Sequence, residues 1–95
     1  MQIDEIIWLS QFVEKLESRH NVTTMEVEEV FVNRPRFRFV AKGNRSGEDV
    51  YSAMGQTGAG RYLIIFFILK PYHCALVVSA RDMDRKERRE YGRKR

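Results

Sequence analysis

The chain has 95 residues, a formal net charge of +4 and a single cysteine. This length predicts one domain over residues 1–95 with a modest core, and a lone cysteine excludes an internal disulfide, which fits a reducing compartment. The acidic N-terminus and the lack of an apolar stretch of membrane-spanning length predict a cytoplasmic protein without a membrane partner.

Two amphipathic helices are predicted in the first third of the chain. The first is expected to begin with Asp4 as its N-cap and to end at residues 18–21, where Asn21 tolerates the left-handed conformation of a helix stop. Its inward stripe follows the helical period and consists of Ile6, Leu9, Phe12, Val13 and Leu16.

A second, shorter helix is expected next, because residues 23–26 (Thr-Thr-Met-Glu) have the pattern of a capping box. Val22 and Val27 have the spacing of the hydrophobic staple that often accompanies such a cap. Proline disfavours the helical conformation in the residue before it, so Arg34 and Pro35 are expected to end the helix.

The apolar period changes to two after residue 35, which predicts strands. Residues 36–41 alternate basic and aromatic side chains, and three further strand-like runs follow at 49–56, 61–69 and 75–81. The run 61–69 is almost continuously apolar, so we expect a central strand covered on both faces. Short connections favour pairing in sequence order. The predicted fold class is therefore α+β, with two N-terminal helices, a four-stranded antiparallel meander and a C-terminal helix.

The last strand and the helix after it carry most of the side chains that could do chemistry. We expect Leu76, Val78 and Ala80 to face the core and the side chains between them to face the opposite side. A capping-box-like pattern from Asp84 opens the last helix, which we expect to run to about Tyr91. Part of residues 86–95 should then form a basic tail.

Charge is distributed unevenly along the chain. Residues 1–33 carry seven acidic and two basic side chains, a net charge of −5, whereas the remaining residues carry six acidic and fifteen basic ones, a net charge of +9. This segregation favours an anionic partner for the second half.

Arginine is suited to such a partner if the partner is single-stranded RNA. The guanidinium group forms forked hydrogen bonds with phosphate and stacks on unpaired bases, and tyrosine rings offer further stacking surfaces. The ordinary alternative is a solvated helix with Glu–Arg pairs. The residues predicted to bind RNA are Arg36, Arg38, Arg85, Arg88, Arg89 and Tyr91, with Tyr51 and Tyr62 as further stacking surfaces.

Several segments together resemble those of one known protein family. Residues 79–81 (Ser-Ala-Arg) and 87–91 (Glu-Arg-Arg-Glu-Tyr) resemble the C-terminal signature of the BrnT-type toxins. Residues 19–22 (Arg-His-Asn-Val) resemble its Lys-His-Gly-Val step, with asparagine in place of the glycine, and residues 24–31 and parts of 55–63 resemble its second helix and central hairpin. The resemblance implies a fold similar to RelE-type ribonucleases, RNA cleavage without a metal ion or other cofactor, and a small antitoxin protein that neutralises the toxin by direct binding.

Metal-free cleavage of RNA needs a base for the 2′-hydroxyl, positive charge for the phosphate and an acid for the leaving oxygen. We predict that Arg81 stabilises the phosphate in the transition state, the alternative being an ion pair with Glu87 or Asp82. His20 is predicted to act as acid or base, or else only to interact with the helix dipole. Glu87 would act as base or complete the helix cap. Arg61 would reach phosphate or lie at the surface in a turn.

Two functions from different classes fit the sequence. One is an endoribonuclease toxin that inhibits translation and is paired with an antitoxin; the other is a non-catalytic basic module of the same fold that binds RNA or protein. The central strand also predicts a patch for the antitoxin or for a homo-oligomer, if three short helices leave it uncovered. Cleavage of RNA by the purified protein in the presence of a chelator supports the enzyme, whereas tight, salt-sensitive binding of intact RNA supports the module.

Overall fold

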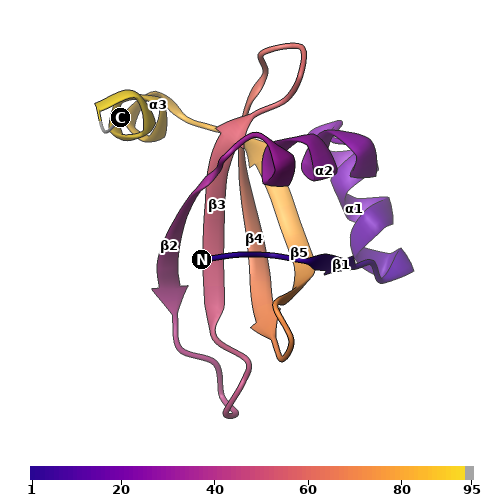
Figure 1. The fold of residues 1–95 in the computed structure, drawn as a ribbon. Helices are drawn as coiled ribbons and strands as arrows, with labels where there is room; N and C mark the ends of the chain where they lie inside the picture. Colours follow the sequence, from indigo (N-terminus) through magenta and orange to yellow (C-terminus); the bar gives the residue numbers. More distant parts are fainter. Residues whose placement is uncertain (94–95) are drawn as a thin grey trace.

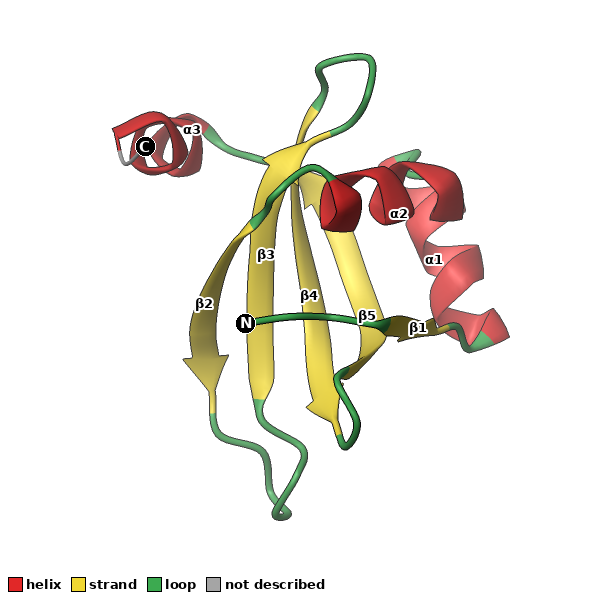
Figure 2. Ribbon diagram, in the orientation of Figure 1, coloured by secondary structure: helices red, strands yellow, loops and turns green. Residues whose placement is uncertain are grey.

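A computed structural model describes residues 1–93 of the chain, which form three helices and one five-stranded mixed sheet (Figures 1 and 2). The strands lie in the order β1-β5-β4-β3-β2, and all neighbours are antiparallel except β1, which runs parallel to β5. The α+β class is confirmed, but the predicted four-stranded antiparallel sheet is wrong because β1 adds a fifth, parallel strand. In chain order the elements are β1 (Glu5–Ile7), α1 (Ser10–His20), α2 (Thr24–Val32), β2 (Arg36–Ala41), β3 (Val50–Gln56), β4 (Tyr62–Lys70), β5 (Cys74–Asp82) and α3 (Arg85–Arg93).

The first helix begins later than predicted, because the residues before it pair with the sheet. The amide of Asp4 donates to the carbonyl of His73 at 2.8 Å, and the next three residues pair with β5. Ile6 therefore packs against the core from a strand and not from a helix. Helix α1 starts only at Ser10, after Leu9, which makes no side-chain cap.

The boundary between α1 and α2 follows the predicted local chemistry. Asn21 adopts the left-handed conformation, with φ of 54°, at the position where the family pattern has glycine. The capping box is formed: the amide of Glu26 donates to the hydroxyl of Thr23 at 3.1 Å, and the amide of Thr23 donates to the Glu26 carboxylate at 3.0 Å. Val22 and Val27 are both fully buried, as a hydrophobic staple requires.

The main core lies on one face of the sheet, which α1, α2 and the N-terminal residues cover (Figure 1). Strand β4 occupies the centre of the strand order, as predicted, and contributes three fully buried side chains to this face. The core consists of Leu16, Val22, Val27, Val30, Ala53, Leu63, Ile65, Phe67, Ala75, Val77 and Ala80.

The opposite face of the sheet is covered at one end by α3. Ile64 of β4 is 5% exposed there and packs with Met54 and Met83. Residues 63–65 are thus buried on both faces of β4, which confirms the predicted cover for that part of the strand. The predicted patch for the antitoxin or for self-association requires an uncovered central strand. The burial of residues 63–65 removes that argument, and the patch stays a prediction.

Two of the faces predicted on β5 are wrong because the strand contains a β-bulge. The register of β5 against β4 shifts by one residue near the middle of the strand, which moves the alternation of side chains to the other face. Ala75 and Val77 are therefore fully buried in place of Leu76 and Val78. Beyond the bulge, Ala80 is buried as predicted.

Helix α3 is longer than predicted and is described over Arg85–Arg93. Residues 92 and 93, where the basic tail was expected to begin, are therefore helical. Residues 94 and 95, the end of that predicted tail, lie outside the described residues.

The capping box of α2 should make a measurable contribution to stability. Replacing Thr23 with alanine removes the hydroxyl that accepts from Glu26, so we expect the free energy of unfolding to fall by about 1 kcal/mol. Urea denaturation measures this loss. Thr24→Ala is the matched control, since Thr24 lies inside the helix and forms no side-chain cap; an equal loss in both variants would contradict the assigned cap.

Candidate functional site

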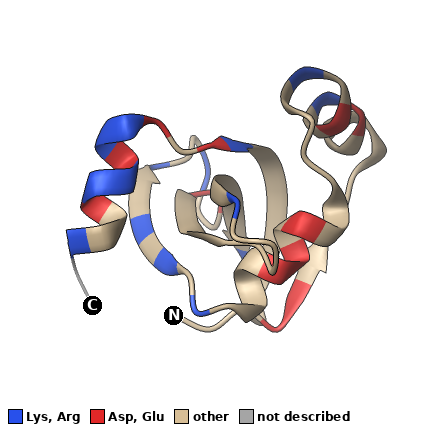
Figure 3. Ribbon diagram, turned by 90° about the horizontal axis from the view of Figure 1, so that it is seen from above, with Lys and Arg blue, Asp and Glu red and all other residues tan. Residues whose placement is uncertain are grey.

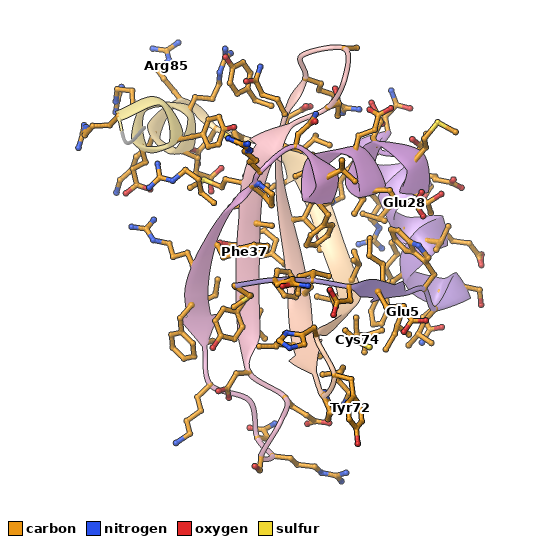
Figure 4. The ribbon with its side chains drawn as sticks, viewed as in Figure 1. Glu5, Glu28, Phe37, Tyr72, Cys74 and Arg85 are labelled. Carbon is orange, nitrogen blue, oxygen red and sulfur yellow. The ribbon has the colours of Figure 1, made fainter. Side chains whose placement is uncertain are left out.

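Helix α3 carries its charges on two different sides. Arg85, Arg88 and Arg89 lie three and four residues apart and share one side, whereas Glu87 and Glu90 share the other. Figure 3 shows basic and acidic segments along this helix, and Figure 4 shows Arg85 directed away from the sheet. No residue of α3 is buried among those described, so contacts made by partly exposed side chains determine its position.

The first anchor of α3 is a forked ion pair between Arg81 and Glu87. The two guanidinium nitrogens of Arg81 donate to the two carboxylate oxygens of Glu87 at 2.8 and 2.9 Å, and the guanidinium lies 5.6 Å from the centre of the Phe66 ring. Glu87 also accepts from the amide of Asp84 at 2.9 Å, while its own amide donates to the Asp84 carboxylate at 2.7 Å. The predicted helix cap is confirmed. The hydrogen bond from Arg81 outweighs burial and lowers the pKa of Glu87.

The second anchor of α3 comes from β2. Arg38 forms an ion pair with Glu90 at 2.7 Å. Arg36 donates to the backbone carbonyls of Glu90 and Tyr91, each at 3.2 Å, which satisfies carbonyl groups in the last turns of the helix. Both ends of α3 are therefore fixed across the same face of the sheet.

A basic groove of about 950 Å³ lies along the arginine side of α3. None of the described residues that line it carries a carboxylate, and two of them are tyrosines. The guanidinium of Arg88 lies 4.1 Å from the centre of the Tyr62 ring, and the rings of Tyr62 and Tyr91 meet edge to face at 6.0 Å. The groove is lined by Asn33, Arg34, Arg36, Gln56, Tyr62, Arg85, Arg88, Arg89, Tyr91 and Gly92.

Most of the residues predicted to bind RNA line this basic groove. Arg38 is the exception, because it is directed to Glu90 on the other side of α3. Tyr51, one of the two further stacking surfaces, stacks on Phe67 in the main core instead. The sequence pattern at Arg34 predicts only a helix end before proline and so misses this groove residue, although its spacing of two from Arg36 is a usable signal. Its backbone has φ of 54° in the α2–β2 connection.

Arg61 is fully occupied in a separate cluster on the helix-covered side of the sheet. It donates to Asp82 at 2.8 Å and to Glu26 at 3.2 Å. It also donates to the backbone carbonyls of His20 and Asn21, at 3.2 and 2.8 Å, where a positive charge complements the C-terminal end of α1. The hydrogen bond from Arg61 outweighs burial and lowers the pKa of Asp82. Arg61 thus ties the β3–β4 hairpin to the α1–α2 corner.

The four predicted catalytic residues therefore do not form one cluster. Arg81 and Glu87 lie together beside α3, whereas Arg61 lies with the last residue of α1, His20. Arg81 and Asp82 are neighbours in β5, so their side chains point to opposite faces of the sheet, and with them the two clusters. None of the four lines the basic groove. For Arg81 and Glu87, the geometry favours the ion pair and the cap that were the alternatives to catalysis.

Within residues 1–93 no group of three or more His, Cys, Asp and Glu side chains is arranged to hold a metal ion. No described helix is both long and apolar enough to span a membrane.

The Arg81–Glu87 anchor predicts a pH-dependent stability. The pKa of Glu87 in the folded protein lies below its ordinary value of 4.5, so the carboxylate stabilises the fold above that value and loses this effect as the pH falls through the folded pKa. Glu87→Gln should therefore lower the thermal transition at pH 7, and the difference from the unmodified protein should shrink in acid. Thermal melts from pH 7 to pH 2 test this, with Glu17→Gln on the exposed side of α1 as control. A difference that is constant with pH would contradict the assignment.

The comparisons with known proteins agree with the fold. Residues 8–87 match the family model described as "Ribonuclease toxin, BrnT, of type II toxin-antitoxin system", while a search of curated proteins gives no match. The structure is similar to the crystal structure of the Brucella abortus ribonuclease toxin BrnT, with a TM-score of 0.59 and 13% sequence identity over 85% of this chain and 97% of that chain. This likeness shows a shared fold. Because the family model covers most of its length, the chain belongs to the BrnT family of ribonuclease toxins of type II toxin–antitoxin systems.

Proposed function

We propose that this BrnT-family toxin is a metal-independent endoribonuclease that binds single-stranded RNA in the basic groove beside α3. The observation that carries the proposal is the set of five arginines and two tyrosines lining one hollow, with no carboxylate among its described residues. Guanidinium groups bind phosphate, and aromatic rings stack on unpaired bases. We also propose that the chain is related to the RelE-type ribonucleases, as the sequence resemblance implies.

The groove supplies the charge stabilisation that cleavage by the 2′-hydroxyl requires. When that hydroxyl attacks the adjacent phosphate, negative charge grows on the phosphate oxygens, and preorganised guanidiniums stabilise it. We assign this role to Arg88 and Arg89, because neither forms an ion pair with a described carboxylate. The hydroxyl groups of Tyr62 and Tyr91 are the O–H groups of the described lining and are our candidates for proton transfer.

Arg81, Glu87 and Arg61 receive supporting roles in this proposal. Arg81 and Glu87 position α3, and through it the arginines of the basic groove. Arg61 holds the β3–β4 hairpin in place. A proton-transfer role for His20 stays a prediction that the geometry does not favour, since His20 is outside the groove lining.

A type II family implies an antitoxin protein as partner. We propose that the antitoxin inhibits the toxin by covering the basic groove with acidic side chains, because the described lining carries positive charge without a compensating carboxylate. The competing function, a non-catalytic basic module, uses the same surface and differs only in leaving bound RNA intact.

A cleavage assay with matched arginine variants tests the proposal. Purified protein is incubated with single-stranded RNA in the presence of a chelator. Cleavage should persist, and Arg88→Ala should reduce its rate by on the order of 100-fold, as expected for loss of one transition-state charge. The salt dependence of RNA binding should fall by about one unit of slope in the same variant.

Arg45→Ala is the matched control for this assay. Arg45 is an exposed arginine in the β2–β3 connection, at the end of the sheet opposite α3 (Figure 1), so its removal changes the net charge equally without touching the basic groove. Equal effects of the two substitutions would contradict the groove assignment. Intact RNA with all proteins, together with salt-sensitive binding, would favour the non-catalytic module.

A further inference from the structure

The basic groove opens into a second hollow of different chemistry. This second hollow measures about 450 Å³ and lies between the end of α2 and the β3–β4 hairpin. Apart from Arg34, its described lining is uncharged and consists of amide side chains, a tyrosine, a valine and the residues of a glycine-containing turn. The two hollows share one wall, formed by Asn33, Arg34, Gln56 and Tyr91.

The polar groups that line the second hollow are held in one arrangement by hydrogen bonds. The side-chain amide of Asn33 donates to the backbone carbonyl of Gln56 at 3.0 Å, which orients its Oδ1 atom as an acceptor. No described residue donates to this Oδ1. The amide of Gly58 donates to the Glu29 carboxylate at 3.0 Å, and the amide of Thr57 donates to the Arg61 carbonyl at 2.9 Å. The polar groups of the second hollow are therefore held in place before any ligand arrives.

The two hollows match the two parts of a nucleotide. The basic groove suits the charged phosphate, and the largely uncharged second hollow suits the flat, neutral, polar base. We infer that the second hollow is a nucleobase subsite: a phosphate lies among the arginines of the basic groove, and the base of the adjoining nucleotide enters the second hollow beside the shared wall. There the base stacks on Tyr91, and Asn33 Oδ1 accepts a hydrogen bond from its edge, while Gln56 contributes a second polar contact. The inference rests on the proposed function, because it names which part of an RNA the same site reads.

A base-paired strand does not satisfy this arrangement, since pairing occupies the base edge and stacking occupies its faces. The subsite therefore selects unpaired RNA and imposes a base preference at one position beside the cleaved bond. Asn33 and Gln56 are specificity residues in this account, and the arginines supply the binding that does not depend on sequence.

Sequencing the cut ends of a mixed-sequence single-stranded RNA tests the subsite. We expect the unmodified protein to show a base preference at one position beside the cut, and Asn33→Ala and Gln56→Ala each to weaken that preference by about fivefold or more. Asn44→Ala, in the exposed β2–β3 connection, should leave it unchanged. Asn33 is also the C-cap of α2, so replacing it affects the end of that helix. Gln56 is the last residue of β3, so Gln56→Ala tests the subsite without changing the helix cap. Thermal melts confirm that each variant is folded.

The outcomes separate this inference from the proposed function. Identical base distributions for all folded variants, with cleavage retained, overturn the subsite and leave the ribonuclease proposal standing. If the unmodified protein cuts no RNA, the catalytic proposal fails, and binding of fluorescent oligo(A), oligo(C) and oligo(U) decides the subsite instead. Equal relative affinities for these oligonucleotides in the unmodified protein and in Asn33→Ala then overturn it, whereas an altered ranking supports it.

Discussion

The placement of α3 depends on two carboxylates that this helix directs back to arginines of the sheet. Glu87 binds the guanidinium of Arg81 through two hydrogen bonds, and Glu90 binds Arg38. Because α3 has no buried residue among those described, apolar burial alone does not hold it in register. The carboxylates neutralise one side of the helix, and the arginines on its other side are left to form the basic groove. Partly exposed ion pairs are individually weak, so the position of α3 depends on both anchors acting together.

The charge segregation along the chain has a structural counterpart. The acidic first third forms α1 and α2 over one face of the sheet, and the basic second half supplies the groove at α3 (Figure 3). Glu28 on α2 and Arg85 on α3 lie on opposite sides of the molecule (Figure 4). A polyanion is therefore attracted to the groove side and repelled from the helix-covered side, which favours one orientation of approach.

The sequence predicts those features that local chemistry determines and fails where pairing across the chain decides. The capping boxes at Thr23 and Asp84 and the left-handed Asn21 follow from side chains close in sequence. Strand β1 is only three residues long and too short to show a period of two, and its pairing with β5 depends on residues about seventy positions away. The bulge in β5 likewise leaves no mark in the sequence, because it lies at the end of the short apolar run 75–78. For the site, the sequence identifies the arginines of α3 as candidates for RNA binding. It does not show which arginines of the chain bind carboxylates instead, because the pairing depends on the side of α3 that each carboxylate faces.

The ribonuclease proposal requires that RNA contacts the arginine side of α3 and not the cluster around Arg61 or the acidic helices. Amide chemical-shift mapping with a 2′-O-methyl RNA heptamer, which cannot be cleaved through its 2′-position, tests it directly. We expect the chemical-shift changes to be concentrated at the groove residues Arg34, Tyr62 and Arg88, with the amides of α1 unaffected. Shifts centred on His20 and Arg61, with the α3 amides unchanged, would contradict it.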